Sequence, residues 1–393
     1  MIDQRLITVL AVLALVPYPS SGQVNLRFSG LGDVLAGVTT GDYADALQRS
    51  LIETFGSDPD PVNTTRGFGL TGFDFVVISD LSADLTFLGE VNLQSARGRS
   101  GDIETDVERA FMDFRVHPKF NVQAGLFFTP IGFNNRFLYA RAWLMNSTQV
   151  PDFYEEELNL VPTHTTGVAV YGEFFLGDSH RLNYIVSAGN GRATTPDAAV
   201  YARDPSPNKE FTALVELLLP GYKTSRIGLS GWTGTIETVK LDAMGDVSLA
   251  ALAEPMEMRE TGLDAFIVWN TRLFSLNGEI VYSRRKDLLG NLFRETYTMT
   301  GGMVEAAVHL MDGKIHPYLR YDQTSLPGGG GPYLSLRGDG DEFRRVFVPE
   351  FQAMIGGVAY DLDLHVRLKI EYARHLDGPR RRSALTAQAA FGF

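Results

Sequence analysis

Residues 365–374 read HVRLKIEYAR, and apolar and polar side chains alternate strictly along this stretch. The apolar set is Val366, Leu368, Ile370 and Tyr372, and the polar set is His365, Arg367, Lys369 and Glu371. Successive side chains of a β-strand point to opposite faces, so the stretch predicts a strand with one apolar and one charged face. The apolar face either closes a protein core or meets lipid. In the second case the charged face lines a water-filled lumen.

The composition limits the classes of protein to consider. The chain has 393 residues, 40 Gly, no Cys and a formal net charge of −12. No apolar run approaches the length of a helical membrane span, which needs about 20 residues. Without Cys, disulfides and thiolate metal sites are excluded. The negative charge, with no basic stripe to offset it, argues against nucleic acid as a partner.

The first 22 residues predict a secretory signal peptide. Arg5 precedes an apolar run over 6–16, prolines follow, and the small residues Ser20, Ser21 and Gly22 suit a cleavage site after Gly22. A buried N-terminal helix is the alternative. We therefore expect the mature chain to begin at residue 23 and to leave the cytoplasm.

Segments of about ten alternating residues recur along the rest of the chain. We place sixteen strands near 24–38, 66–79, 82–96, 105–117, 119–129, 165–176, 180–189, 209–219, 223–236, 259–270, 271–284, 294–310, 314–323, 346–361, 362–375 and 382–393. Their connections alternate between tight turns rich in Asp, Asn, Gly and Pro and longer loops. Such asymmetry, with an even strand number, is typical of bacterial outer-membrane barrels with short periplasmic turns and long outer loops.

In such a barrel, the apolar face of each strand meets lipid and the polar face meets the lumen. If the register of residues 365–374 shifted by one residue, Arg367 and Lys369 would face lipid. Each would then destabilise the barrel by roughly 2–4 kcal/mol near the bilayer midplane. In the strand 346–361 we assign Phe351, Ala353, Ile355 and Ala359 to the lipid face. Large aromatics near both ends of the apolar faces predict two interfacial girdles: Phe128, Tyr282, Tyr321 and Tyr372 at one end and Phe120, Phe174, Trp269 and Phe393 at the other. The sequence therefore predicts an all-β fold, with residues 23–393 forming a single transmembrane antiparallel β-barrel.

A barrel of sixteen strands is too wide to be filled by side chains, so the contents of its lumen decide its function. The longest loop, 130–164, is too apolar for a solvated tip, and we expect it to fold inward as a constriction. Its charged residues are Arg136, Arg141, Asp152, Glu155, Glu156 and Glu157, and they would face Arg320, Arg367 and Lys369 on the wall. Glu90, Arg109, Asp113 and Arg115 are further expected lumen-wall residues. Opposed rows of charge would sort solutes by charge and dipole. Alternatively, Glu155–Glu157 is a solvated run on top of the barrel.

The stretch 122–135, VQAGLFFTPIGFNN, resembles the strand-to-loop motif of the phosphate-selective porin O and P family. The matching residues are Gly125, Phe127, Thr129, Pro130 and Gly132, and the likeness is best over 66–190. The family often has Lys before Thr-Pro where this chain has Phe128, and no lysine-rich loop is present. The resemblance implies an outer-membrane porin whose partners are lipid and small hydrophilic solutes or ions. Wide porins of this size commonly form homotrimers, which we also expect here.

Residues 42–55, DYADALQRSLIETF, have helical apolar spacing and predict a short helix in the first outer loop. The alternative is a hatch, as in channels resembling those for long-chain fatty acids. A non-conducting structural or adhesive barrel is a further alternative, and a soluble secreted β-protein is the weakest.

The sequence offers little for catalysis or for a cofactor. Neither GxSxG nor HExxH occurs, so we expect no enzyme, no catalytic residue and no cofactor. His309 and His316 flank a predicted turn and could approach each other across a hairpin. We expect them to be polar lumen lining rather than metal ligands.

Overall fold

The computed structural model describes most of the chain after residue 24. The described ranges are 25–40, 66–95, 103–138, 142–148, 150–154, 160–193, 208–221, 225–237, 257–290, 295–326, 332–337, 343–347, 350–376 and 383–393. The expected signal peptide, 1–22, and the expected helix, 42–55, lie outside these ranges. Within them, no helix has both the length and the apolar character needed to cross a bilayer.

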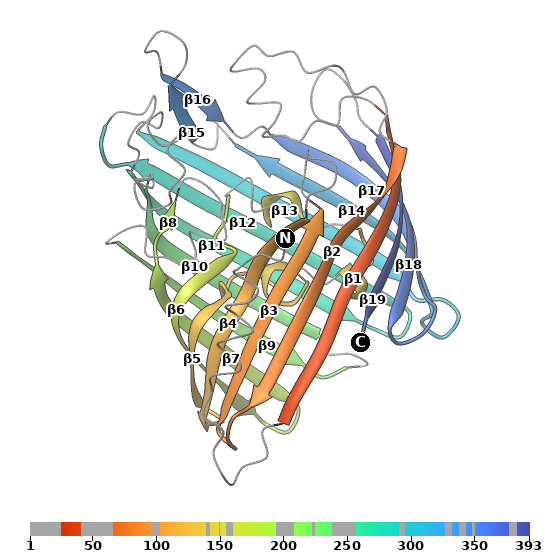
Figure 1. Cartoon of the computed structure of the whole chain (residues 1–393), viewed down its shortest axis with the longest axis horizontal. Helices are drawn as coiled ribbons and strands as arrows, with labels where there is room; N and C mark the ends of the chain where they lie inside the picture. Colours follow the sequence, from red (N-terminus) through yellow and green to blue (C-terminus); the bar gives the residue numbers. More distant parts are fainter. Residues whose placement is uncertain are drawn as a thin grey trace.

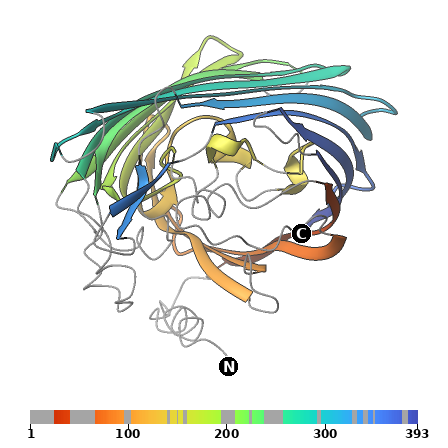
Figure 2. The ribbon, with the colours of Figure 1, turned by 90° about the horizontal axis from the view of Figure 1, so that it is seen from above.

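Sixteen long strands form one closed antiparallel barrel, as predicted. They are β1 (Asn25–Thr40), β2 (Arg66–Asp80), β3 (Leu85–Ser95), β4 (Ile103–His117), β5 (Phe120–Phe128), β6 (His164–Leu176), β7 (His180–Asn190), β9 (Lys209–Leu219), β10 (Ser225–Glu237), β11 (Glu257–Asn270), β12 (Phe274–Asp287), β13 (Thr296–Val308), β14 (Ile315–Ser325), β17 (Phe351–Asp361), β18 (Val366–His375) and β19 (Ser383–Gly392). Each pairs with its neighbours in order, and β1 pairs with β19 to close the ring. Figure 1 shows the strands tilted around the barrel, and Figure 2 shows the ring from above.

The opening stretch forms β18 and has the inside-out pattern of such a barrel. Leu368, Ile370 and Tyr372 are 39%, 62% and 48% exposed on the outer face. Lys369 and Glu371 face inward and are each only 2% exposed. The charged side chains are buried because other parts of the chain fill this region of the lumen.

The start of the strand predicted over 346–361 is wrong. The barrel strand β17 begins at Phe351, whereas β16 (Phe343–Phe347) pairs with β15 (Pro332–Arg337) in a separate hairpin. That hairpin extends beyond the barrel rim (Figure 1). A second small addition is β8 (Arg192–Ala193), which pairs in parallel with β10.

The lipid-face assignment for this strand is also wrong. Ala353, Ile355 and Ala359 are at most 1% exposed and face inward, whereas Met354 is on the exposed outer face. The inward residues belong to an apolar cluster of Ala307, Tyr318, Ala353, Ile355, Ala373 and Ala384. Both faces of β17 are therefore apolar, and a period of two cannot tell them apart.

One predicted girdle residue is misplaced. Phe128 is 8% exposed, and its ring lies 4.8 Å below the Arg109 guanidinium and 4.9 Å from the His164 ring. It is buried because it stands where β5 turns into the longest loop. Tyr282, Tyr372, Phe120, Phe174, Trp269 and Phe393 are each at least 39% exposed.

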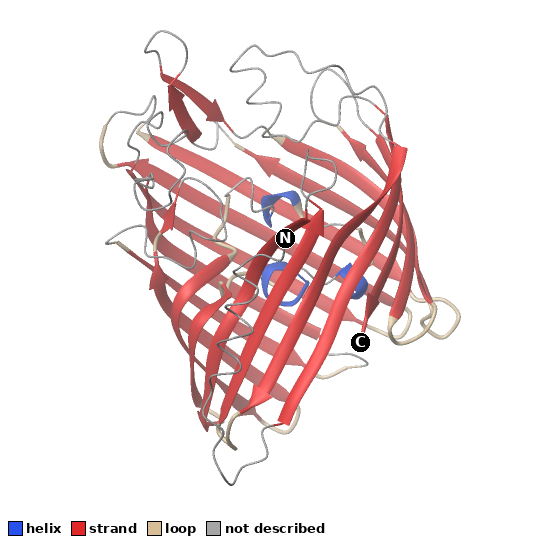
Figure 3. Cartoon of the chain, in the orientation of Figure 1, coloured by secondary structure: helices blue, strands red, loops and turns tan. Residues whose placement is uncertain are grey.

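Three short helical segments interrupt the strand pattern, all within the loop between β5 and β6. They are η1 (Asn134–Leu138), η2 (Ala142–Leu144) and η3 (Asp152–Tyr154). Figure 3 shows them at mid-height of the barrel, and Figure 2 shows them inside the ring. This loop therefore positions the candidate site.

Candidate pore constriction

The two ends of the loop are tied together where it leaves the barrel wall. The backbone N–H of Thr129 donates to the carbonyl of Thr163 at 2.8 Å, and the Thr129 hydroxyl lies 2.8 Å from that of Thr165. The side-chain amide of Asn135 donates to the carbonyls of Thr129 and Thr163 at 2.9 and 3.0 Å. These bonds satisfy buried backbone acceptors and close the neck of the loop.

Gly132 turns the chain into the lumen. Its φ is +56°, a left-handed conformation that costs a glycine little. A Cβ atom there would collide with the carboxylate of Glu279 and the hydroxyl of Tyr154. The Gly132 N–H donates to the hydroxyl of Ser230 at 3.1 Å. The Thr-Pro-Ile-Gly segment thus needs its glycine for both conformation and space.

Glu279 of β12 is the first anchor of the loop. Its carboxylate accepts bonds from the backbone N–H and side-chain amide of Asn134, at 3.1 and 2.5 Å, and from the Tyr154 hydroxyl. Asp264 of β11 accepts a hydrogen bond from the Ser230 hydroxyl at 3.3 Å. Burial and the adjacent Glu279 raise the pKa of Tyr154 well above its usual range.

Glu371 of β18 is the second anchor. It accepts from the Ser147 hydroxyl at 2.7 Å and from the Thr148 N–H and hydroxyl at 3.0 and 2.6 Å. The Tyr318 hydroxyl donates to it at 2.6 Å. Between the anchors, the side-chain amide of Asn146 donates to Glu305 of β13 at 2.9 Å.

Apolar packing fills the space around the first anchor. The loop contributes Ile131, Phe153, Tyr154, Leu160 and Val161, all at most 3% exposed. The wall contributes Trp232, Val281, Met299 and Met303, together with Leu326 at the end of β14. Burying a large apolar side chain contributes about 1.5–3 kcal/mol. The loop is thus held by a small core of its own inside the barrel.

The predicted wall cations meet hydrogen-bond acceptors nearby. Arg320 donates to Asp322 of its own strand at 2.7 Å. Arg367 bonds to Asp361 at 2.9 Å and donates to the carbonyls of residues 144 and 145 at 3.2 Å. The Lys369 ammonium donates to the Ser147 carbonyl at 2.7 Å. These cations thus bond to wall carboxylates and to the loop backbone.

The predicted loop residues are placed only in part. Arg136 lies 3.5 Å from Glu216 of β9, beside Arg226, and 4.7 Å above the Phe137 ring. Burial lowers its pKa from the usual value. Asp152 begins η3 and is near enough to Arg320 to interact with its charge. Arg141 and Glu155–Glu157 lie outside the described residues.

The four expected lumen-wall residues lie on β3 and β4. Glu90 is 1% exposed and forms an ion pair with Arg109. Asp113 accepts from the Tyr171 hydroxyl at 2.6 Å. Arg115 is exposed near the tight-turn end, 3.6 Å from Asp80.

Sequence reasoning missed the acidic anchors of the wall. Four glutamates lie on the polar, inward faces of alternating strands: Glu216, Glu279, Glu305 and Glu371. The alternation of apolar and polar residues could therefore have identified them. The sequence pattern pointed to the basic residues of these faces as partners for the loop, whereas the structure shows carboxylates in that role. A loop rich in Asn, Ser and Thr offers donors, and donors select carboxylates.

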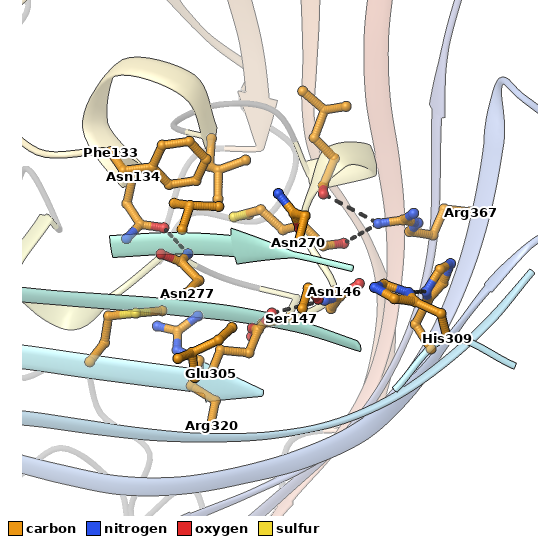
Figure 4. A pocket seen from close by; sticks show the side chains of 18 residues that line it. Phe133, Asn134, Asn146, Ser147, Asn270, Asn277, Glu305, His309, Arg320 and Arg367 are labelled. Atoms are coloured by element: carbon orange, nitrogen blue, oxygen red, sulfur yellow. Dashed lines mark hydrogen bonds between the residues drawn. The ribbon is translucent and has the colours of Figure 1, made fainter. Parts of the chain in front are cut away.

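A cavity of ≈ 780 Å³, which includes open solvent, lies between the loop and the wall (Figure 4). Its polar lining includes Asn134, Asn146, Asn277, Glu305, Arg320 and Arg367. Phe133, Leu138 and Met303 add apolar surface. The space is therefore suited to hydrated polar molecules rather than to a single tightly bound apolar ligand.

No protein-family model matches the sequence, and no curated protein matches it either. Solved structures do match. The anion-selective porin from Comamonas acidovorans aligns with 10% identity and a TM-score of 0.57, over 94% of this chain and 100% of that one. The outer membrane channel DcaP of Acinetobacter baumannii has 12% identity and a TM-score of 0.52, with 95% and 99% covered. The trimer form of OmpT, an outer membrane protein of Vibrio cholerae, has 10% identity and a TM-score of 0.52, with 95% and 100% covered. The chain therefore has the barrel fold that these outer-membrane proteins share.

Proposed function

We propose that the protein is a porin of the bacterial outer membrane that passes small hydrophilic solutes or ions by passive diffusion. The barrel fold, the apolar outer face and the polar interior support this function. The N-terminal segment 1–22 would direct export. We propose neither the phosphate selectivity of the porin O and P family nor a catalytic activity for this protein.

The course of the loop is the main support. In the sheet order, β14 lies half-way around the ring from β5, and β12, β13 and β18 lie near β14. The loop leaves β5 and bonds to Glu279, Glu305 and Glu371 on β12, β13 and β18. It therefore crosses the lumen to the far wall. A segment held across a pore narrows it.

We propose that the charged residues at this narrow part set ion selectivity. The loop would contribute Arg136, Arg141, Asp152 and Glu155–Glu157, and the wall Arg320, Arg367 and Lys369. The solved OmpT neighbour is described as a trimer, which supports the expectation of a homotrimer for this chain.

The test is single-channel recording of the detergent-purified protein in a planar bilayer, with a salt gradient to obtain the reversal potential. We expect stepwise, ohmic conductance. Replacing Glu155, Glu156 and Glu157 with Gln should shift selectivity toward anions, whereas Glu173→Gln, near the turn end of β6, should leave it unchanged. An unmoved reversal potential would place the acidic run outside the pore.

A silent protein would instead favour the hatch or the non-conducting barrel. Deleting residues 42–55 then separates these two. A hatch predicts that conductance appears on deletion, and a structural or adhesive barrel predicts continued silence.

A further inference from the structure

Two histidines face each other at the tight-turn end of the lumen. The isolated bridge between Leu310 and Ile315 continues the β13–β14 ladder, so His309 and His316 are directly opposed. Their Nδ1 atoms are 2.8 Å apart, and their rings are edge-to-face with centroids 5.0 Å apart. Figure 4 shows His309 at one side of the cavity, with Arg367 nearby.

A carboxylate fixes the orientation of one ring. The Nε2 atom of His316 lies 2.9 Å from an oxygen of Asp361, which also bonds to Arg367. His316 is 3% exposed, and both of its ring nitrogens have a partner, His309 on one side and Asp361 on the other. A carboxylate accepts the Nε2 proton of a neutral imidazole, and the Nδ1 lone pair of His316 then points at His309. This carboxylate–imidazole arrangement is the one that orients metal-binding histidines.

The space beside the pair is open. Both imidazoles line the ≈ 780 Å³ cavity, and His309 is the less buried of the two. The charges of Asp361 and Arg367 offset each other through their ion pair. The cavity is also lined by Glu305, whose carboxyl group accepts a hydrogen bond from Asn146.

Contrary to the expectation from the sequence, we propose that His309 and His316 bind a divalent transition-metal ion through their Nδ1 atoms. Metal–nitrogen bonds of 2.0–2.1 Å place adjacent nitrogens about 2.9 Å apart in the tetragonal geometry that Cu²⁺ prefers and about 3.3 Å apart in a tetrahedral site, and the two Nδ1 atoms are 2.8 Å apart. Both rings need to turn so that their Nδ1 lone pairs converge on the ion. The proton that His309 shares with His316 moves to its Nε2 atom or is released. Asp361 is the positioning residue.

The site has two protein ligands, with water in the remaining positions. Among the described residues, no group of three or more His, Asp or Glu side chains is arranged to hold a metal. Imidazole ligands suit Cu, Ni and Zn, and the Irving–Williams order places Cu²⁺ first in affinity. We therefore expect Cu²⁺ to bind more tightly than Ni²⁺ or Zn²⁺.

The binding test uses electron paramagnetic resonance of Cu²⁺ added to the full-length barrel in detergent, purified without a polyhistidine tag. We expect one ion per chain with two nitrogen donors. Both His309→Gln and His316→Gln should abolish that signal. Asp361→Asn should weaken binding about 10-fold, as loss of an orienting partner does. His180→Gln, at the first residue of β7, is the matched control and should change nothing.

Heat-modifiable mobility on gels verifies that each variant retains its barrel. No stoichiometric Cu²⁺ signal in the folded wild-type protein would overturn the proposal. So would a signal that survives in His309→Gln, or one that disappears in His180→Gln.

Conductance supplies a second readout, which rests on the proposed porin function. A bound ion adds positive charge to the lumen, so Cu²⁺ should reduce the current in wild-type protein reversibly, with recovery on adding a chelator. The block should be absent in His316→Gln. A two-nitrogen Cu²⁺ signal in a protein that conducts nothing would support the metal site and overturn the porin function.

Discussion

Glu279 accepts hydrogen bonds from both the backbone N–H and the side-chain amide of Asn134, although the two residues are 145 positions apart in the sequence. One carboxylate on β12 therefore holds the beginning of the loop that leaves β5. The same carboxylate accepts from Tyr154, near the end of the loop. Both halves of the loop depend on a single wall residue.

Replacing Glu279 with Ala should release this half of the loop. Three donors lose their acceptor, and each buried donor left unsatisfied costs about 1–3 kcal/mol. We expect a lower unfolding temperature and a larger, noisier single-channel conductance. Glu173→Ala removes a carboxylate near the turn end and serves as the control. Unchanged conductance in folded Glu279→Ala would show that this anchor does not restrict the pore.

Gly132→Ala tests whether the loop entry needs space as well as a left-handed backbone. Gly177 has φ +71° and no atom within 4 Å of the place that a Cβ would occupy, whereas Gly132 has both positive φ and a collision. Left-handed strain costs roughly 1–2 kcal/mol and should affect both Gly132→Ala and Gly177→Ala. Only Gly132→Ala should also raise the conductance, because its Cβ displaces Glu279 and Tyr154. Equal behaviour of the two variants in calorimetry and in bilayers would contradict this expectation.

Single cysteines should report which side of β12 faces water, because the chain has no Cys of its own. Asn277 lines the cavity, and Ile280 is 59% exposed on the outer face. A charged methanethiosulfonate reagent should lower the current of Asn277→Cys and leave Ile280→Cys unaffected. The reverse result would mean that the inward and outward faces of β12 are exchanged.

Tyr154 predicts a loss of stability in alkali. Its pKa is raised above the usual value of 10.0 in the folded protein, so its contribution is full below pH 10 and is lost as the pH rises from there toward the folded-state pKa. A hydrogen bond to a charged group contributes about 1.5–3 kcal/mol. The difference in unfolding temperature between wild type and Tyr154→Phe should therefore shrink above pH 10. If the difference in unfolding temperature stays constant up to pH 12, ionisation of Tyr154 does not cause the loss of stability in alkali.

The two anchors should act together. Glu371→Gln weakens the bonds to Ser147 and Thr148 but keeps the shape of the side chain. Combined with Glu279→Ala it should raise the conductance by more than the sum of the single changes, because either anchor alone still holds part of the loop. Strictly additive effects in a double-mutant cycle would indicate two independent segments.

Much of the fold was predictable because alternation is a local signal. The opening stretch alone fixes which face of β18 is charged, and the tight turns and long loops supply the strand number. The register of β17 was not predictable, because Met354 outside and Ile355 inside are equally apolar. The bonds between Asn134 and Glu279 were also beyond reach, since nothing local relates residues so distant in sequence. An excess of apolar residues did single out the loop, but the carboxylates that hold it become visible only once the strands are placed around the ring.

Closure of the ring has a consequence for how the protein folds. Gln388 of β19 donates to Asp33 of β1, across 355 positions of sequence. Contacts of such separation require nearly the whole chain to be ordered before they form, and they are slow for that reason. Until then the sheet has two unpaired edges, which invite pairing with other chains. We therefore expect pairing of β1 with β19 to be the slow step of folding, during which the open chain is prone to aggregate.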